Sequence, residues 1–305
     1  MSHPSQYQHF NADNLDYPSR RRRSADGRFL DWGNPRTKPS PFDEIRWPKI
    51  DPSQCKFCGR RYTLACILAM LPDQDTCEKL CHLFCATVFP LIPLLHLPSF
   101  ADDFRAFWEE TDSTGRHDAE IGPFVRKKPG FVCLLSSILF ATLASVSPLR
   151  LKNVLGDDID LAPGDMYFPA VASGMLTGFP RKPSLYTLAG YIFAQSQFVR
   201  EEDFPDSQEF INTAFRIALG MGLHRDIPEA GFSVAEREMR RRLWWYILHL
   251  DVMSSASSGL SPLFIDEKMA NTDMVSPYYQ NEGVATEEHR QSENETPPYF
   301  LLSLD

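Results

Sequence analysis

The sequence predicts an all-α fold, a multi-helical bundle or solenoid-like array of antiparallel helices. Three observations lead to this class. Apolar residues recur at three- and four-residue steps, proline, glycine and aspartate separate these stretches, and no series of alternating β-branched segments bounded by hairpin turns occurs. Of the 305 residues, 43% are hydrophobic and 12% are aromatic, which is enough to build a substantial core. We therefore expect helices joined by short loops.

Helical periodicity begins at about residue 73. A first helix is expected over residues 73–88, because Leu80 and Phe84 fall on one face together with three cysteines at four-residue spacing. Pro90 and Pro93 follow this stretch. Proline cannot continue a helix, because it lacks the backbone N–H and its ring clashes with the preceding turn.

Two further helices are expected over residues 100–108 and 131–146. The first is aromatic, and Ser99 in front of it is expected to be the N-cap, since a serine hydroxyl accepts a hydrogen bond from the first turn. The second is the most apolar stretch of the chain and ends at Pro148. It is interrupted by Ser and Thr and is shorter than the roughly 20 residues that span a membrane, so we interpret it as a buried core helix.

The last helices are expected over residues 185–200, 207–222 and 234–254. Two adjacent tryptophans in the final helix, Trp244 and Trp245, cannot both face the core, because neighbouring side chains are about 100° apart around a helix. One is expected to pack inward, and the other to cover an adjoining helix or to stack with an arginine. The predicted buried stripe of this helix comprises Met239, Leu243, Tyr246, Ile247 and Leu250.

The two ends of the chain differ from this helical body. Residues 1–54 are rich in Ser, Pro, Asp, Arg and His without periodicity, which predicts a disordered basic tail. Residues 1–61 hold twelve Lys and Arg against seven Asp and Glu, so the formal charge of −9 comes from an acidic body. Residues 55–72 are expected to form a linker with a Cys-x-x-Cys pair. Residues 277–305 are expected to form a polar linker and the truncated start of a further helix.

Four consecutive arginines, Arg20, Arg21, Arg22 and Arg23, lie in the basic tail. Compact basic runs serve as nuclear import signals or as arms that contact phosphate groups. An import signal and a merely solvated charge run are the two interpretations. Four arginines alone attract DNA only weakly and in a salt-sensitive way, and an acidic body is a poor surface for nucleic acid.

Residues 207–276 carry the most informative motifs. A Gly-Leu-His-Arg-Asp sequence ends one helix, an Arg-Arg-Leu-Trp-Trp sequence lies in the next, and an aspartate and a glycine-containing loop follow. Upstream, a Pro-rich segment with a histidine precedes the short aromatic helix. Over roughly residues 73–276, this set resembles the fungal-specific transcription factor domain, the middle homology region of fungal binuclear zinc-cluster transcription factors. The matching residues are Gly222, Leu223, His224, Arg225, Asp226, Arg241, Arg242, Leu243, Trp244, Trp245, Asp251 and Gly259.

The resemblance implies a nuclear transcription regulator that acts through its helical domain. It implies that zinc and DNA contact belong to a separate six-cysteine cluster, which has no recognisable counterpart in this sequence, or to a partner protein. The expected partners are other transcription regulators, in a homo- or heterodimer, and a small-molecule effector in a pocket lined by Phe193, Phe198, Trp244 and Trp245. The alternative is a protein-interaction or dimerisation module without a DNA-binding domain of its own.

The arginine run at residues 240–242 has two interpretations. Clustered guanidinium groups suit phosphate, which would make a nucleic-acid patch. Because acidic residues are interleaved with the run, we favour internal pairing, with Asp226 or Asp251 as the partner. His224 lies at a helix end and is expected to cap carbonyl groups there and to have no catalytic role.

Seven cysteines, an odd number, and the lack of an apolar segment at the N-terminus argue against secretion and a disulfide framework. The cysteine spacing departs from the zinc cluster of the resembled family. Cys55, Cys58 and Cys66, with His82, are weak candidates for a metal site, and ordinary thiols are the favoured interpretation. The cysteines of the first helix are expected to be buried as small apolar residues. They are Cys77, Cys81 and Cys85.

No motif of an enzyme active site occurs in the sequence. It has no Gly-x-Ser-x-Gly elbow, no His-Glu-x-x-His pair, no phosphate-binding loop and no dinucleotide fingerprint. Gly220 and Gly222 form a lone pair at a helix end, which is better explained as a helix stop. We therefore expect no catalytic residues and no cofactor within this chain.

Overall fold

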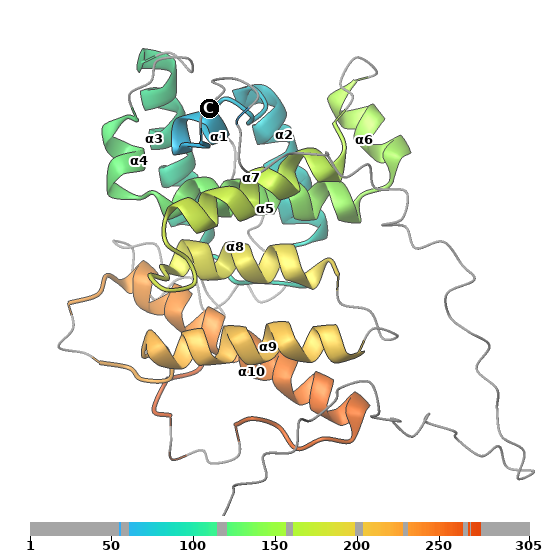
Figure 1. Cartoon of the computed structure of the whole chain (residues 1–305), viewed down its shortest axis with the longest axis vertical. Helices are drawn as coiled ribbons and strands as arrows, with labels where there is room; N and C mark the ends of the chain where they lie inside the picture. Colours follow the sequence, from blue (N-terminus) through green and yellow to red (C-terminus); the bar gives the residue numbers. More distant parts are fainter. Residues whose placement is uncertain are drawn as a thin grey trace, which may run out of the picture. The chain divides into compact units, whose positions relative to one another are not determined.

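The computed structural model describes residues 55, 61–114, 121–156, 161–198, 204–227, 231–264, 268 and 270–275. Over these residues the chain is helical and contains no strand, which confirms the all-α prediction. The described helices (Figure 1) are α1 (Leu64–Leu68), α2 (Gln74–Thr87), α3 (Leu97–Thr114), α4 (Pro123–Lys127), α5 (Gly130–Ser145), α6 (Pro148–Leu155), α7 (Pro163–Leu176), α8 (Leu185–Ser196), α9 (Phe204–Gly220) and α10 (Val234–Ser258).

Helix α5 forms the centre of the fold. It packs most extensively against α7 and α8 and also contacts α2 and α4. Every residue from Gly130 to Leu143 is buried, as expected for the most apolar stretch of the sequence. Among the described helices, none combines the length and the low polarity that crossing a bilayer requires.

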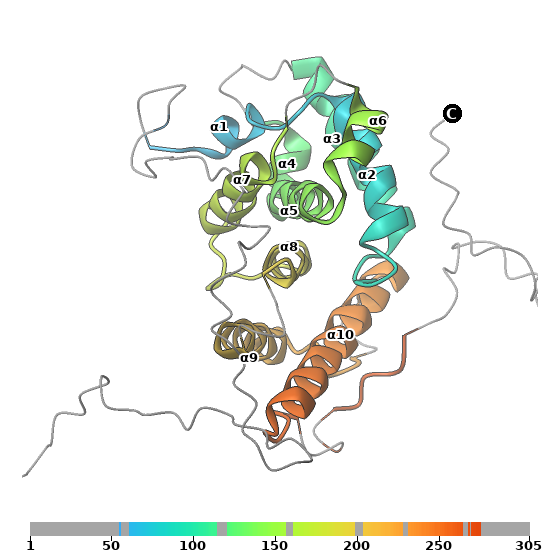
Figure 2. The same cartoon turned by 90° about the vertical axis from the view of Figure 1, so that its right-hand side faces the viewer.

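Helices α8, α9 and α10 extend the array on the side of α5 away from α1 and α3. Helix α8 packs against both α9 and α10, and these two pack against each other. Figure 2 shows α5, α8 and α9 nearly end-on, with α2 and α10 along one side. Gly190 allows α8 to approach α5 closely, because a Cβ atom there would lie 3.2 Å from Cys133 Sγ.

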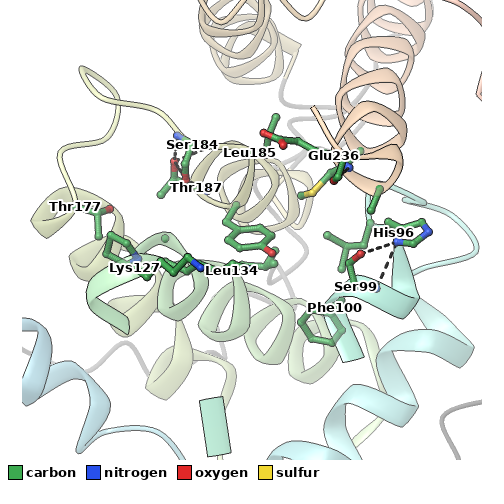
Figure 3. Close-up of a pocket in the computed structure, with 18 of the residues that line it drawn as sticks. His96, Ser99, Phe100, Lys127, Leu134, Thr177, Ser184, Leu185, Thr187 and Glu236 are labelled. Atoms are coloured by element: carbon green, nitrogen blue, oxygen red, sulfur yellow. Dashed lines mark hydrogen bonds between the residues drawn. The ribbon is translucent and has the colours of Figure 1, made fainter. Parts of the chain in front are cut away.

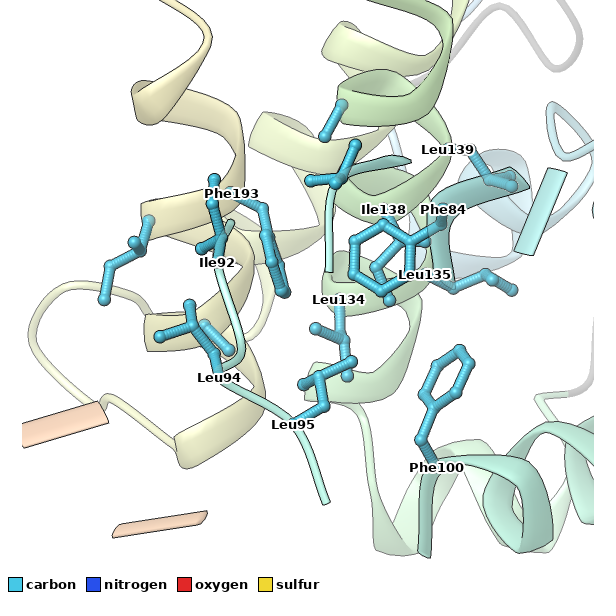
Figure 4. Close-up of a cluster of buried hydrophobic side chains, with 14 of the residues drawn as sticks. Phe84, Ile92, Leu94, Leu95, Phe100, Leu134, Leu135, Ile138, Leu139 and Phe193 are labelled. Carbon is cyan, nitrogen blue, oxygen red and sulfur yellow. The ribbon is translucent and has the colours of Figure 1, made fainter. Parts of the chain in front are cut away.

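One apolar core joins these helices (Figure 4). Phe84 of α2 meets Phe193 of α8 edge-on, with ring centroids 5.2 Å apart. The Pro-rich segment between α2 and α3 contributes Ile92, Leu94 and Leu95, which are all buried. This irregular segment is therefore a part of the core and places the start of α3 against α5.

Helix α3 starts earlier than the sequence predicted. It begins at Leu97, and His96 caps it, because His96 Nδ1 accepts a hydrogen bond from the backbone N–H of Ser99 at 3.3 Å. The prediction that Ser99 is the N-cap is therefore wrong, since Ser99 lies in the first turn. The physical reason is Pro98. Backbone N–H groups in the first turn of a helix have no partner within the helix, so proline, which lacks this group, is tolerated there.

Three helices that the sequence did not predict begin with proline: α4, α6 and α7. Pro148 opens α6, and Ser147 Oγ caps it by accepting from the backbone N–H of Arg150 at 3.4 Å. Helix α7 begins with Pro163 and contains Pro169. It packs along α5, so tertiary contacts outweigh the low helix propensity of its prolines and glycines.

The segment predicted to be a linker, residues 55–72, contains helix α1. Thr63 caps this helix by accepting from the backbone N–H of Cys66. Ile67 and Leu71 are buried in the core, and α1 packs against α7. The described part of this segment is therefore folded against the helical body.

The end of α9 is fixed by a glycine with left-handed backbone conformation. Gly222 has a φ of 67°. Its N–H donates to Leu219 O at 2.9 Å, and the N–H of Leu223 donates to Ala218 O at 3.0 Å. These two bonds make a Schellman motif, so the helix stops here as predicted, and Gly222 is the glycine of the pair that stops it.

Gly222→Ala is expected to lower the free energy of unfolding by about 1 kcal/mol, because a Cβ atom strains this backbone conformation. Gly220→Ala is the control: Gly220 is in the last turn of α9, a Cβ atom there meets only open space, and the change is expected to be neutral or stabilising. Urea unfolding followed by circular dichroism measures both. Equal losses in the two variants would contradict the assignment.

Candidate functional site

The motif residues gather at the junction between α9 and α10. Arg241 donates from Nε and Nη2 to Asp226 Oδ2 at 3.0 and 2.7 Å, and from Nη2 to Asp273 Oδ2 at 2.9 Å. Asp226 Oδ2 also accepts from the backbone N–H of Asp273 at 3.0 Å. The arginine run is therefore paired internally. Asp226, one of the two aspartates proposed from the sequence, is the partner of Arg241.

Burial and hydrogen bonding act in opposite directions on the pKa of Asp226. Burial raises it, whereas the hydrogen bonds from Arg241 and from the backbone of Asp273 lower it, and the net pKa lies below the ordinary value for aspartate. Asp226 is therefore ionised at neutral pH, and its bonds to Arg241 are charge-assisted.

Asp226→Asn is expected to lower the free energy of unfolding by about 2 kcal/mol at neutral pH, because it removes these charge-assisted bonds. The folded pKa lies below the unfolded one, so the stabilisation is complete above the unfolded pKa of about 4 and is lost as the pH falls through the folded pKa. Urea unfolding of both proteins across the acid range measures the difference. A difference that persists at the lowest pH would refute this assignment.

Arg240, and not His224, caps the end of α9. Arg240 Nη2 donates to Met221 O at 3.2 Å and to Gly222 O at 2.9 Å. His224 Nδ1 has no hydrogen-bond partner among the described residues, and the ring packs on Trp244 with centroids 5.8 Å apart. The prediction that His224 caps these carbonyls is therefore wrong, because a long side chain reaches them across the junction from α10.

Arg242 is buried and ties α10 to the Pro-rich segment. Its Nη2 lies 2.8 Å from Glu238 Oε1, one helical turn earlier, and the two side chains are only 8% and 10% exposed. Arg242 Nη1 also donates to Pro93 O at 3.3 Å. Both Arg241 and Arg242 are thus bound by carboxylates of this chain.

Trp244 faces the core, and Trp245 lies at the surface of the junction. Trp244 is fully buried, stacks on Phe215 with ring centroids 5.8 Å apart, and meets Phe264 edge-on. Trp245 is half-buried, and its Nε1 donates to Asp273 O at 2.8 Å. The prediction that one tryptophan packs inward is confirmed. Of the predicted stripe, the buried members are Met239, Leu243 and Ile247, and the half-buried members are Tyr246 and Leu250.

Asp251 and Gly259 shape the loop that follows α10. Asp251 is buried, and its Oδ2 accepts from the backbone N–H groups of Leu263 and Phe264 at 2.7 and 3.3 Å. Gly259 ends the helix with a φ of 70°. These hydrogen bonds of Asp251 hold the loop and do not involve the arginine run.

Residues 270–275 close the junction. Thr272 Oγ1 donates to the carbonyl of buried Leu223 at 2.8 Å, and Asn271 Oδ1 accepts from the backbone N–H of Asp226 at 3.0 Å. Arg225 is exposed beside them. Sequence reasoning did not single out this segment, because it has no helical or strand period that marks it.

A cavity of about 470 Å³ lies where α3, α5, α8 and α10 begin (Figure 3). Small-molecule sites have volumes of roughly 300–1,000 Å³. Its charged or titratable lining residues are His96, Lys127, Lys128, Lys182, Tyr186 and Glu236. Its larger apolar lining residues are Leu95, Phe100, Leu134, Leu185 and Met239.

One lysine of the cavity is fixed by an acidic side chain. Lys128 Nζ lies 2.6 Å from Asp103 Oδ1, and the hydroxyl of Tyr186 donates to Asp103 Oδ2. Burial first of all, and then this carboxylate, raises the pKa of Tyr186 far above its ordinary value, so Tyr186 stays protonated. Lys127 and Lys182 form no ion pair within the described part of the chain.

The four aromatic residues predicted to line an effector pocket do not line this cavity. Phe193 and Trp244 are fully buried in the core. Phe198 stacks on Phe140 with centroids 5.9 Å apart, and Trp245 covers the helix junction. Large aromatic side chains are stabilised most where they bury their whole surface, and the sequence does not reveal that core positions take Phe193 and Trp244.

The weak metal candidates have other surroundings. Cys55 is buried, and Cys66 Sγ lies 3.2 Å from Thr63 Oγ1. His82 is on the exposed side of α2, and Cys58 lies outside the described residues. In the described ranges no three His, Cys, Asp or Glu side chains are grouped to hold a metal ion. The cysteines of α2 are buried, as predicted: Cys77, Cys81 and Cys85.

The predicted import signal, Arg20 to Arg23, also lies outside the described residues.

The sequence did not single out the cavity lysines. They belong to segments far apart in the sequence, and no spacing rule connects Lys127 with Lys182.

Comparisons with known proteins point to one family. The family model described as "Fungal specific transcription factor domain" matches residues 81–304. The chain is 32% identical over 218 residues to the transcription factor macR of Penicillium terrestre. The aligned region covers 69% of this chain and 25% of macR. It is 31% identical over 212 residues to the transcription factor yanR of Aspergillus niger, covering 68% of this chain and 26% of yanR.

A third relative is the C6 finger domain transcription factor hasF of Aspergillus fumigatus, with 25% identity over 245 residues, 75% of this chain and 31% of hasF. The chain thus spans about a quarter to a third of the length of these curated relatives. No solved structure matches it.

Proposed function

Because the chain belongs to the fungal-specific transcription factor domain family, we propose that it is the helical regulatory part of a nuclear transcription regulator of the fungal zinc-cluster type. Its relatives are named transcription factors, and the chain corresponds to a minor part of their length. In this proposal the domain acts by binding and packing, and no catalytic step is assigned to it.

The neutralised arginine run carries this proposal. Affinity for DNA comes largely from Lys and Arg side chains that displace counterions from phosphates. Arg241 is bound by Asp226, and Arg242 by Glu238, so these guanidinium groups serve the fold. We assign contact with DNA, and the zinc that supports it, to a zinc cluster that this sequence does not contain or to one in a partner, and nuclear import to the arginine run at residues 20–23.

Fusing the chain to an unrelated sequence-specific DNA-binding domain tests the proposal. Transcription of a reporter that carries the matching site is expected to change severalfold relative to the DNA-binding domain alone. The isolated chain is expected to give no shift of random duplex DNA that survives moderate salt. A nuclear, cooperatively folded fusion that leaves the reporter unchanged would contradict the proposal.

Apolar side chains at the end of α10 favour a second candidate function, a dimerisation module. Val252 and Met253 are 52% and 58% exposed, and Leu260 and Leu263 just after the helix are 61% and 44% exposed. Apolar side chains gathered at a surface favour association. Sedimentation of the purified chain and of a Met253→Glu variant tests this candidate. It requires that the purified chain forms a dimer and that the variant dimerises more weakly.

We also propose that the regulator takes a small-molecule effector, and that the cavity at the start of α10 is its binding site. The cavity has the volume of a small-molecule site and combines an apolar wall with charged groups. An effector bound there contacts four helices at once, including α10, which carries the arginine run.

A further inference from the structure

The charges around the cavity are predominantly positive. Lys127, Lys128 and Lys182 line it, against one carboxylate, Glu236. Asp103 neutralises Lys128 from outside the lining, whereas Lys127 and Lys182 are exposed and form no ion pair within the described residues. Two ammonium groups at the mouth of the cavity are therefore available to a ligand.

The helices around the cavity add to this positive potential. Helices α3, α5, α8 and α10 all begin there, and the N-terminus of a helix carries a partial positive charge from N–H groups without helical partners. Ser184 and Ser233 cap α8 and α10, but α5 has no side-chain cap. Figure 3 shows labelled side chains from the starts of α3, α8 and α10, with Leu134 of α5, around one space.

The interior of the cavity is apolar. Leu95, Phe100 and Leu134 are at most 4% exposed, and Met239 of α10 is 6% exposed. All four line the cavity, as does Leu185 of α8. A ligand that fits this arrangement needs an apolar body for the interior and a negative group for the lysines at the mouth.

We propose that the cavity binds a small amphipathic anion, a molecule with an apolar body and one carboxylate or phosphate group. The anion pairs with Lys127 and Lys182, and the apolar body packs against Leu134 and Met239. Binding links α10 to α5 through the ligand. This inference deepens the proposed function, because it assigns the chemical class of the effector and the residues that recognise it.

Calorimetric titration of the purified chain with decanoate, decanol and decylamine tests the charge requirement. Decanoate is expected to bind about tenfold more tightly than decanol, and decylamine more weakly than either. Decyl phosphate replaces the carboxylate by a phosphate, and whichever of the two anions binds more tightly identifies the preferred group. Equal binding of decanoate, decanol and decylamine, or no binding of either anion at about 1 mM, overturns the proposal.

Variants tie the binding to this cavity. The double variant Lys127→Gln/Lys182→Gln is expected to weaken decanoate about tenfold and to leave decanol unchanged. Lys79→Gln on α2, which does not line the cavity, is the matched control and is expected to change neither. Ala235→Phe fills the cavity from α10 and is expected to abolish binding of both probes. Unchanged decanoate affinity in the double variant overturns the proposal.

These measurements separate the ligand assignment from the proposed function, because titration of the isolated chain does not depend on transcription. Intact, lysine-dependent decanoate binding beside an inactive reporter fusion refutes only the proposed function. An active fusion whose domain binds neither anion refutes only the ligand assignment.

Discussion

Replacing Arg242 by methionine is expected to lower the free energy of unfolding by about 3 kcal/mol, because it breaks the buried ion pair with Glu238. Both side chains are at most 10% exposed, and Arg242 also donates to Pro93 O. The change therefore also loosens the contact between α10 and the Pro-rich segment. Equilibrium unfolding in urea, followed by far-ultraviolet circular dichroism, measures the loss.

Two further variants show whether the loss of stability comes from removing the ion pair itself or from leaving only one of its charges buried. Arg242→Met/Glu238→Leu removes both charges and is expected to recover most of the lost stability, since apolar residues of similar volume replace a buried pair at little cost. Arg216→Met changes an exposed arginine of α9 and is expected to stay within about 0.5 kcal/mol of the original protein. A loss in Arg242→Met no larger than in Arg216→Met would refute the structural role of the pair.

Trp244→Ala is expected to cost about 4 kcal/mol, because it removes a fully buried indole and leaves a cavity beside Phe215 and Phe264. The neighbouring change, Trp245→Ala, is expected to cost about 1–2 kcal/mol, because Trp245 is half-buried and loses one hydrogen bond to Asp273 O. Urea unfolding of the two variants side by side gives the comparison. The reverse order of the two losses would contradict the orientation of α10.

These two changes affect one helix at different faces. The first turn of α10 lines the cavity through Ala235 and Glu236, whereas Trp244 anchors its middle in the core. Decanoate binding measured in Trp245→Ala, the milder variant, shows whether the outer face of α10 influences the cavity. We expect no change, because Trp245 contacts residues 270–275 and does not line the cavity.

Helices with a regular apolar period were predictable, and helices that begin with proline were not. Helix α2 follows the prediction closely, with Asp73 as its cap and Val88 at its end. Helices α6 and α7 open with Pro148 and Pro163, which a sequence-based argument treats as breaks. A proline has the same local signature whether it ends one helix or begins the next, and only the packing of the following residues distinguishes the two.

Side-chain partners divide in a similar way. The inward orientation of one tryptophan follows from helix geometry, and the interleaved charges indicate that the arginine run is paired internally. Which aspartate Arg241 binds depends on the packing of α9 against α10. The cap on α9 does not follow, because Arg240 reaches Met221 O and Gly222 O from the next helix.

The sequence by itself determined the helical class, the central buried helix α5, the glycine stop at the end of α9 and the family motifs, because each depends on residues within a few helical turns. Only the tertiary structure decided where the cavity lies and which residues line it. Lys127 and Lys182 are brought to one cavity by the packing of α8 against α5, a contact that no local period encodes.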